Sequence, residues 1–157
     1  KSRVSVKSKA NTSNNPIFEY RNTFATTDKD GDLIQIDTKG NLTKSNLNLR
    51  SGHTIDMTSK SLVSFSENNL LIKGIPVVLP FGNYTPPKIH YLNNTIYVTL
   101  TDLDTQKVYA YYSNGTAVNG FPVYGNSKVD LTNADDDKAI EMVVQSETNS
   151  FLIYQIN

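Results

Sequence analysis

Two acidic turns contain the residues whose types and spacing could bind a metal ion. The first is Asp28-Lys29-Asp30-Gly31-Asp32, in which carboxylates alternate around a glycine. Loops that wrap oxygen ligands around Ca²⁺ use this arrangement. An EF-hand loop starting at Asp28 would need a glutamate at its twelfth position, where this chain has Lys39. A shorter calcium turn with Asp28, Asp30 and Asp32 as ligands is one interpretation. The interpretation that we favour is a solvated hairpin turn.

The second acidic turn is the run Asp135-Asp136-Asp137, which Lys138 follows directly. Three adjacent carboxylates repel one another unless a cation or a lysine relieves the repulsion. The nearby oxygen-bearing residues are Asp130, Asn133 and Glu141. We therefore expect no cofactor, with Ca²⁺ as the one exception that the two turns leave open. The candidate metal ligands are Asp28, Asp30, Asp32, Asp135 and Asp137.

The chain offers little for catalysis. It has no cysteine, and its two histidines are His53 and His90. A single histidine in a β domain is typically a packed or surface residue. The sequence contains no Gly-x-Ser-x-Gly elbow, Walker loop or His-Glu-x-x-His helix. We expect no catalytic residue. One alternative stays open, a hydrolytic carboxylate pair formed by Asp102 or Asp104 with Glu67 or Glu147.

Tyrosines form the last group with functional potential. Exposed tyrosines stack on sugar rings or anchor protein partners, whereas buried ones form cores and cross-strand pairs. Both interpretations stay open for the tyrosines around the third unit of the chain, which are Tyr84, Tyr91, Tyr97, Tyr109, Tyr111 and Tyr124.

Short β-strands must position these residues, because period-two alternation runs through almost the whole chain. Residues 96–101 and 108–112 alternate on either side of a polar turn, as in a β-hairpin. The same hairpin recurs three more times. The first apolar residues of the four return strands are separated by 37, 38 and 43 residues, close to the period of a four-stranded propeller blade, and they are Leu33, Leu70, Val108 and Phe151.

The flanks of the hairpins repeat as well. A short strand candidate precedes each hairpin, and a glycine turn leads to one more strand after the first three. Pro76 and Pro122 in these last strands suit a sheet edge, since proline cannot donate to a ladder. Residues 16–157 are therefore predicted to form units at about 17–49, 54–80, 88–124 and 128–157, the fourth without its last strand. Residues 1–15 are predicted to be a linker, or to supply a closing strand at 3–6.

Composition limits the class of protein. The 157 residues include 15 basic and 15 acidic side chains, and a net charge of zero excludes the basic footprint of a nucleic-acid-binding domain. No apolar run approaches the length that crosses a bilayer, so we expect no membrane insertion. The fold class is therefore all-β, a β-propeller or a propeller segment of about four four-stranded antiparallel blades. A β-sandwich is the second choice.

The last third of the chain resembles a known group of proteins. The relevant phrases are Val108-Tyr109-Ala110-Tyr111-Tyr112, Gly120-Phe121-Pro122-Val123 and residues 129–144 with their acidic turn. They are similar to repeats of bacterial β-propellers of the quinoprotein-like and integrin-like (FG-GAP) kind, and to the C-terminal region of large Bacteroidetes proteins. The resemblance implies calcium at the second acidic turn. This chain departs from it by having Lys138 there and no glycine within the turn.

The function expected from the sequence is that of a non-catalytic binding or scaffolding module in a larger, envelope-associated bacterial protein. Its expected partners are a protein or a glycan, and its unfinished sheet edges predict self-association. The alternative is a carbohydrate-active or other hydrolytic propeller, which would need two carboxylates facing each other in a cleft.

Overall fold

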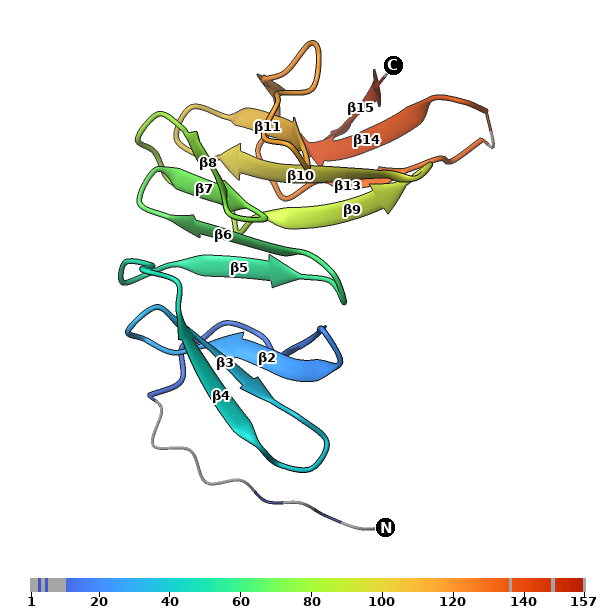
Figure 1. Cartoon of the computed structure of the whole chain (residues 1–157). Coiled ribbons are helices and arrows are strands. Elements are labelled where there is room, and N and C mark those ends of the chain that lie inside the picture. The colour runs from blue at the N-terminus through green and yellow to red at the C-terminus, as the bar shows by residue number, and fades with distance from the viewer. Residues whose placement is uncertain (1–2, 4, 6–10, 136, 148, 157) are drawn as a thin grey trace.

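Figure 1 shows a computed structural model of the chain, which describes residues 3, 5, 11–135, 137–147 and 149–156. The described residues form fifteen β-strands and no helix. Among them, therefore, no helix is long and apolar enough to cross a membrane. The short strands follow from the period-two alternation and from the many Asn, Ser, Thr and Gly residues that make the turns.

The strands form four antiparallel sheets in chain order, which we call blades 1 to 4. Blade 1 consists of β1 (Phe18–Tyr20), β2 (Thr23–Thr27), β3 (Asp32–Ile36) and β4 (Leu42–Asn46). Blade 2 consists of β5 (Thr54–Met57), β6 (Leu62–Ser66), β7 (Asn69–Ile72) and β8 (Ile75–Val78). Blade 3 consists of β9 (Lys88–Leu92), β10 (Thr95–Asp102), β11 (Lys107–Tyr112) and β12 (Val123–Tyr124). Blade 4 consists of β13 (Asp130–Thr132), β14 (Ile140–Gln145) and β15 (Phe151–Ile156).

This architecture confirms the predicted fold class, four consecutive antiparallel sheets in an all-β chain. The fourth sheet has three strands, so β15 is an edge strand among the described residues. Pro76 lies in β8, which pairs with β7 alone, as expected for a proline at a sheet edge. A closing strand at residues 3–6 was also expected, but residues 4 and 6 lie outside the described part of the chain.

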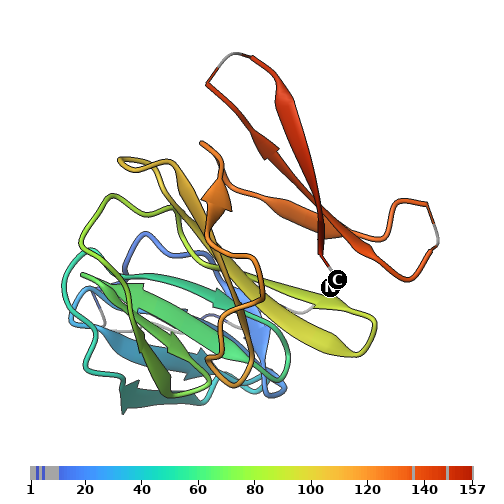
Figure 2. The same ribbon diagram turned by 90° about the horizontal axis from the view of Figure 1, so that it is seen from above.

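The blades follow one another in an open series. The first strands of the blades, β1, β5, β9 and β13, are neighbours in that order and form the inner side of the series. Blade 1 lies at one end and blade 4 at the other (Figure 1). The view from above shows the β14–β15 hairpin projecting away from the other sheets (Figure 2). The described residues therefore form a propeller-like segment without a closed ring.

Apolar side chains fill the space between consecutive blades. Leu33 of β3 packs with Ile55 and Met57 of β5 between blades 1 and 2. Leu70 lies in the core between blades 2 and 3, and Val108 lies in the core between blades 3 and 4. Burying one such side chain completely contributes about 1.5–3 kcal/mol relative to leaving it in water. Each blade is thus held mainly by the face of the next.

One glycine has a clear steric role in blade 1. Gly31 lies in the turn between β2 and β3 with a φ of +84°, a conformation that other residues rarely adopt. A Cβ atom built there would lie 2.2 Å from the Leu49 carbonyl oxygen. Only glycine lets the backbone after β4 approach this turn so closely. The neighbouring segment at 11–15 is anchored too, since the Ser13 amide donates to the Thr27 carbonyl at 3.0 Å.

Candidate functional site

A cleft of about 700 Å³ opens at one end of the inner strands, and we call it the axial cleft. Its walls come from blades 1, 2 and 3 and from the segment that leads into β13. Three lysines line it, namely Lys29 in the β2–β3 turn, Lys88 at the start of β9 and Lys128 just before β13. Asp56 of β5 is the single carboxylate among the described lining residues. The arrangement gives the cleft an excess of positive charge.

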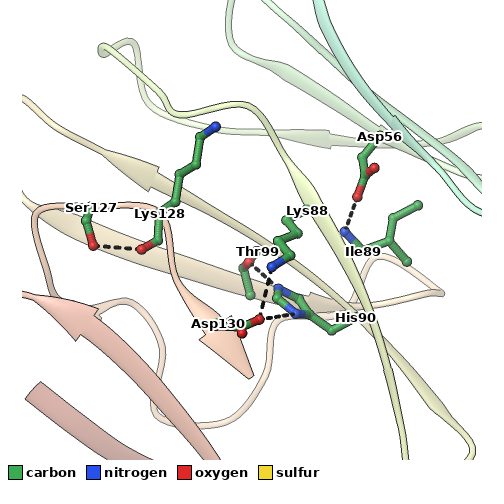
Figure 3. A network of polar contacts seen from close by, with 8 residues as sticks. All are labelled: Asp56, Lys88, Ile89, His90, Thr99, Ser127, Lys128 and Asp130. Atoms are coloured by element: carbon green, nitrogen blue, oxygen red, sulfur yellow. Dashed lines mark hydrogen bonds and ion pairs between the residues drawn. The ribbon is translucent and has the colours of Figure 1, made fainter. Parts of the chain in front are cut away.

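Asp56 spends its hydrogen-bonding capacity on the protein backbone. Its Oδ2 accepts a hydrogen bond from the Ile89 amide at 2.7 Å, which ties β5 to β9 (Figure 3). Its Oδ1 accepts another from the Met57 amide at 2.9 Å. Burial raises the pKa of Asp56 in spite of these bonds and of the nearby Lys88 charge. Asp56 therefore links blades 2 and 3 through a hydrogen bond, and its charge offsets the positive charge of the lysines only in part.

Lys88 and His90 belong to one polar network beside the cleft (Figure 3). The Lys88 Nζ lies 3.0 Å from the Asp130 Oδ1, an exposed ion pair between blades 3 and 4. His90 is buried, and its Nε2 lies 2.9 Å from the Thr99 Oγ1. Burial, helped by the Lys88 charge, lowers the pKa of His90 to about 4. His90 is neutral at pH 7, so its 3.8 Å approach to Asp130 is a weak polar contact there.

His53 lines the axial cleft but is a structural residue. Its Nδ1 lies 2.9 Å from the Arg50 carbonyl oxygen, which can only accept, so Nδ1 carries the hydrogen. The Nε2 then accepts a hydrogen bond from the Thr27 hydroxyl at 2.8 Å. Both ring nitrogens are satisfied inside the protein. This is the geometry of a packed histidine with both ring nitrogens hydrogen-bonded.

The first acidic turn contains its own cation. Asp28 is fully buried, and its Oδ1 accepts hydrogen bonds from the amides of Asp30 and Asp32 at 3.0 and 2.9 Å. The Lys44 Nζ on β4 lies 2.8 Å from the Asp28 Oδ2 and 2.7 Å from the Asp32 Oδ2. Burial alone would raise the pKa of Asp28, but Lys44 and the two amides hold it below its usual value. The ammonium group occupies the position in which a cation would balance these carboxylates.

The second acidic turn brings oxygen atoms together without a lysine between them. Oxygen atoms of Asp135, Asp137 and Glu141 lie within 4.8 Å of one another. Each carboxylate uses one oxygen to accept a backbone amide, from Asp137, Ala139 and Ala134 respectively. Within the described residues, no hydrogen bond to the second oxygen of each carboxylate is found.

The nearby amide of Asn133 supports the same donor set. Its Nδ2 donates to the Asp137 carbonyl, whereas its Oδ1 is buried and has no hydrogen-bond partner among the residues that the structure describes. Carboxylate and amide oxygens are ligands that Ca²⁺ takes, and water molecules commonly complete its shell. The carboxylates of Asp135, Asp137 and Glu141 are therefore ligands of the kind that calcium takes.

The residues considered for a hydrolytic pair lie elsewhere. Asp102 is fully buried and accepts hydrogen bonds from the Thr105 hydroxyl and the Asp104 amide, so it organises its own turn. The Glu147 carboxylate accepts from Gln106 on the outer side of blades 3 and 4. Glu67 is exposed in the β6–β7 turn. None of these four carboxylates lines the axial cleft.

Most of the tyrosines pack between blades. Tyr84 contacts the rings of Phe65 and Tyr109 at centroid distances of 4.9 and 6.0 Å, and Tyr97 contacts Tyr112 at 5.5 Å. Tyr91 and Tyr124 are exposed at different places on the surface.

The lysines of the cleft were missed by the sequence analysis. A signal for two of them existed, because Lys88 and Lys128 open the strand candidates that precede the third and fourth hairpins.

Comparisons with known proteins bear on the fold. No protein-family model matches the chain, and no match was found among curated proteins. The chain is similar to a solved structure, the crystal structure of the computationally designed Ika4 protein, with a TM-score of 0.64 and 14% sequence identity. The match covers 100% of this chain and 99% of that chain. At this identity the likeness concerns the fold alone.

Replacing Asp28 tests the role of the first acidic turn. Asp28→Ala should lower the free energy of unfolding by about 1–3 kcal/mol, because two part-buried amides and Lys44 lose their acceptor. Asp28→Asn keeps the Oδ1 acceptor and should cost less. Asp30→Ala, at an exposed carboxylate of the same turn, should stay within about 0.5 kcal/mol of the wild type in urea denaturation. An equally large loss for Asp30→Ala would contradict the assignment.

Calcium binding at the second acidic turn is tested by isothermal titration with CaCl₂ and by melting temperature. We expect Ca²⁺ to raise the melting temperature, because a ligand that binds the folded state stabilises it. The Asp135→Asn/Asp137→Asn variant should lose both the heat of binding and the shift. Asp30→Asn is the control and should keep both. Loss of binding in the control would place the ion in the first turn instead, and no binding to the wild type would rule out calcium.

His90 predicts a dependence of stability on pH. The unfolded histidine takes up a proton near pH 6.5, while the folded one stays neutral down to about pH 4. The unfolded state therefore binds more protons in this window, and the free energy of unfolding should fall by on the order of 3 kcal/mol as the pH drops from 6.5 to 4. His90→Gln should flatten this part of the profile in urea denaturation. Asp130→Asn should act mainly below pH 4, and an unchanged His90→Gln profile would contradict the prediction.

Proposed function

We propose that the chain is a non-catalytic binding module whose axial cleft takes a ligand with acidic groups. The observation that carries the proposal is the gathering of Lys29, Lys88 and Lys128 around one cleft with Asp56 as its single described carboxylate. The whole chain has a net charge of zero, so this is a local excess of positive charge. Clefts lined by one sign of charge raise the local concentration of oppositely charged ligands.

Lys29 and Lys128 are the lysines that we expect to contact the ligand. Lys88 is already paired with Asp130, whereas no ion pair involves Lys29 or Lys128 within the described residues. Both are exposed, and they enter the cleft from blade 1 and from the segment before blade 4. Their spacing around the cleft suits a ligand that carries more than one acidic group.

An acidic glycan is the ligand class that the lining favours. The size of the cleft is in the range of sites that enclose small ligands. Besides the lysines, the lining offers Asn14, Asn15 and Ser51 as hydrogen-bonding groups and Phe18 as an apolar surface. Such a mixture suits sugar hydroxyls and rings, and lysines add affinity for carboxylates. An acidic protein segment is the second partner class of the proposal.

The module is further proposed to be part of a larger protein and to associate with itself. A scaffolding role in a larger, envelope-associated bacterial protein rests on the resemblance to bacterial propeller repeats. Self-association through sheet edges rests on β15, which is unpaired on one side within the described residues. The hydrolytic alternative has no comparable support, since its candidate carboxylates do not line the cleft.

Binding of oligosaccharides measured by isothermal titration tests the proposal. Uronic-acid oligosaccharides should bind, neutral oligosaccharides of equal length should not, and added salt should weaken binding. The Lys29→Glu/Lys128→Glu variant should lose at least about tenfold in affinity. Lys39→Glu/Lys107→Glu makes the same change of charge at lysines outside the cleft and should bind as the wild type does.

Three outcomes would contradict the proposal. Equal losses of affinity in the two lysine variants would mean that binding depends on the net charge of the chain and not on the cleft. Binding of an acidic peptide without binding of any oligosaccharide would mean that the ligand is a protein segment. Release of shorter sugars during the titration would show catalysis.

A further inference from the structure

One position of the repeat is buried in three blades and exposed in the fourth. Leu33, Leu70 and Val108 are the first apolar residues of the return strands β3, β7 and β11, and their exposed fractions are 5%, 0% and 0%. Each of them packs against the blade that follows. Phe151 opens the return strand of blade 4 and is 68% exposed. In blades 1 to 3, this position is therefore covered by the face of another blade.

Phe151 is part of an apolar surface that we call the leading face of blade 4. Ile153 follows two residues later on the same side of β15 and is 71% exposed. The half-buried Val143 of β14 pairs with Ile153 directly. The opposite side of this sheet packs on blade 3 through Met142 and Val144, so the leading face points away from the described chain.

Blade 1 presents the complementary kind of surface, which we call its trailing face. Phe24, Ile36 and Leu42 lie opposite one another on β2, β3 and β4 and form a row across the sheet. Phe24 is 55% exposed and Leu42 is 38% exposed. In blade 2 the corresponding side of the sheet packs on blade 1 through Ile55 and Met57. The trailing face of blade 1 is therefore of the type that receives a preceding blade.

We propose that these two faces bind each other between two copies of the chain. The leading face of blade 4 in one copy packs on the trailing face of blade 1 in the other, and the second pair of faces meets in the same way. Each contact continues the series of apolar interfaces that joins blades 1 to 4 within one chain. A head-to-tail contact of this kind leaves no end open when the assembly closes into a ring.

A second copy suits these faces because one chain carries both of them, and they lie at opposite ends of its open series of blades (Figure 1). Large apolar side chains on the face of a sheet are normally covered by another layer. This self-association uses sheet faces and is separate from the sheet-edge contact and from ligand binding at the axial cleft.

Light scattering after size-exclusion chromatography, at protein concentrations from 1 to 200 µM, tests the inference. The wild type should have twice the mass of the chain, with no further growth as the concentration rises. Phe151→Glu/Ile153→Glu disables the leading face, and Phe24→Glu/Leu42→Glu disables the trailing face. Each variant alone should be a monomer. Val78→Glu/Phe81→Glu changes exposed apolar residues outside both faces and should leave the dimer unchanged.

Mixing the two disabled variants provides the sharpest test. Each retains one intact face, so an equimolar mixture should form a one-to-one complex through a single head-to-tail contact, whereas neither variant self-associates. Circular dichroism and thermal melting confirm that each variant is folded.

Four outcomes would overturn the inference: a wild-type monomer at every concentration, a dimer that survives both disabling variants, a mixture that stays monomeric, or a mass that grows with concentration. Loss of the dimer in the Val78→Glu/Phe81→Glu control would mean that the two copies meet through sheet edges and not through these faces.

Discussion

Packing of one apolar sheet face on the next is the interaction on which the structure depends. No blade has a core of its own, because a single antiparallel sheet can bury its apolar side chains only against another layer. Leu33, Leu70 and Val108 show the rule, since each is buried by the blade that follows. The stability of one blade is therefore tied to its neighbour, as in other repeat architectures. The two outward faces of blades 1 and 4 are a direct consequence.

The same packing creates the axial cleft. It holds the inner strands β1, β5 and β9 side by side, so residues near the start of each strand meet at one end of these inner strands. The hydrogen bond from the Ile89 amide to Asp56 and the ion pair between Lys88 and Asp130 then fix neighbouring blades relative to one another. Apolar packing has little directionality, so these polar contacts determine how neighbouring blades are aligned along their shared interface. The cleft is thus a product of the blade interfaces rather than of any one loop.

Local patterns predicted the strands well and the site poorly. The expected strands at 96–101 and 108–112 fall within β10 and β11, because alternation and turn residues act over a few positions. The partner of Asp28 could not be read in this way, since Lys44 reaches the turn from β4 through the sheet register. The cleft was missed for a similar reason. Its lysines are far apart in sequence, and only the angle between blades brings them together.

The neutral composition of the chain hides a separation of charge. Two carboxylates of the first acidic turn are held by Lys44, and Asp130 is paired with Lys88, so these charges act locally. Within the described residues, acidic side chains also gather at the β13–β14 turn, and basic side chains are in excess at the axial cleft. Screening by salt limits such fields to about 8–10 Å, so each group of charges acts mainly on ions and side chains close to it. A chain with a net charge of zero can therefore attract a cation at one place and an acidic ligand at another.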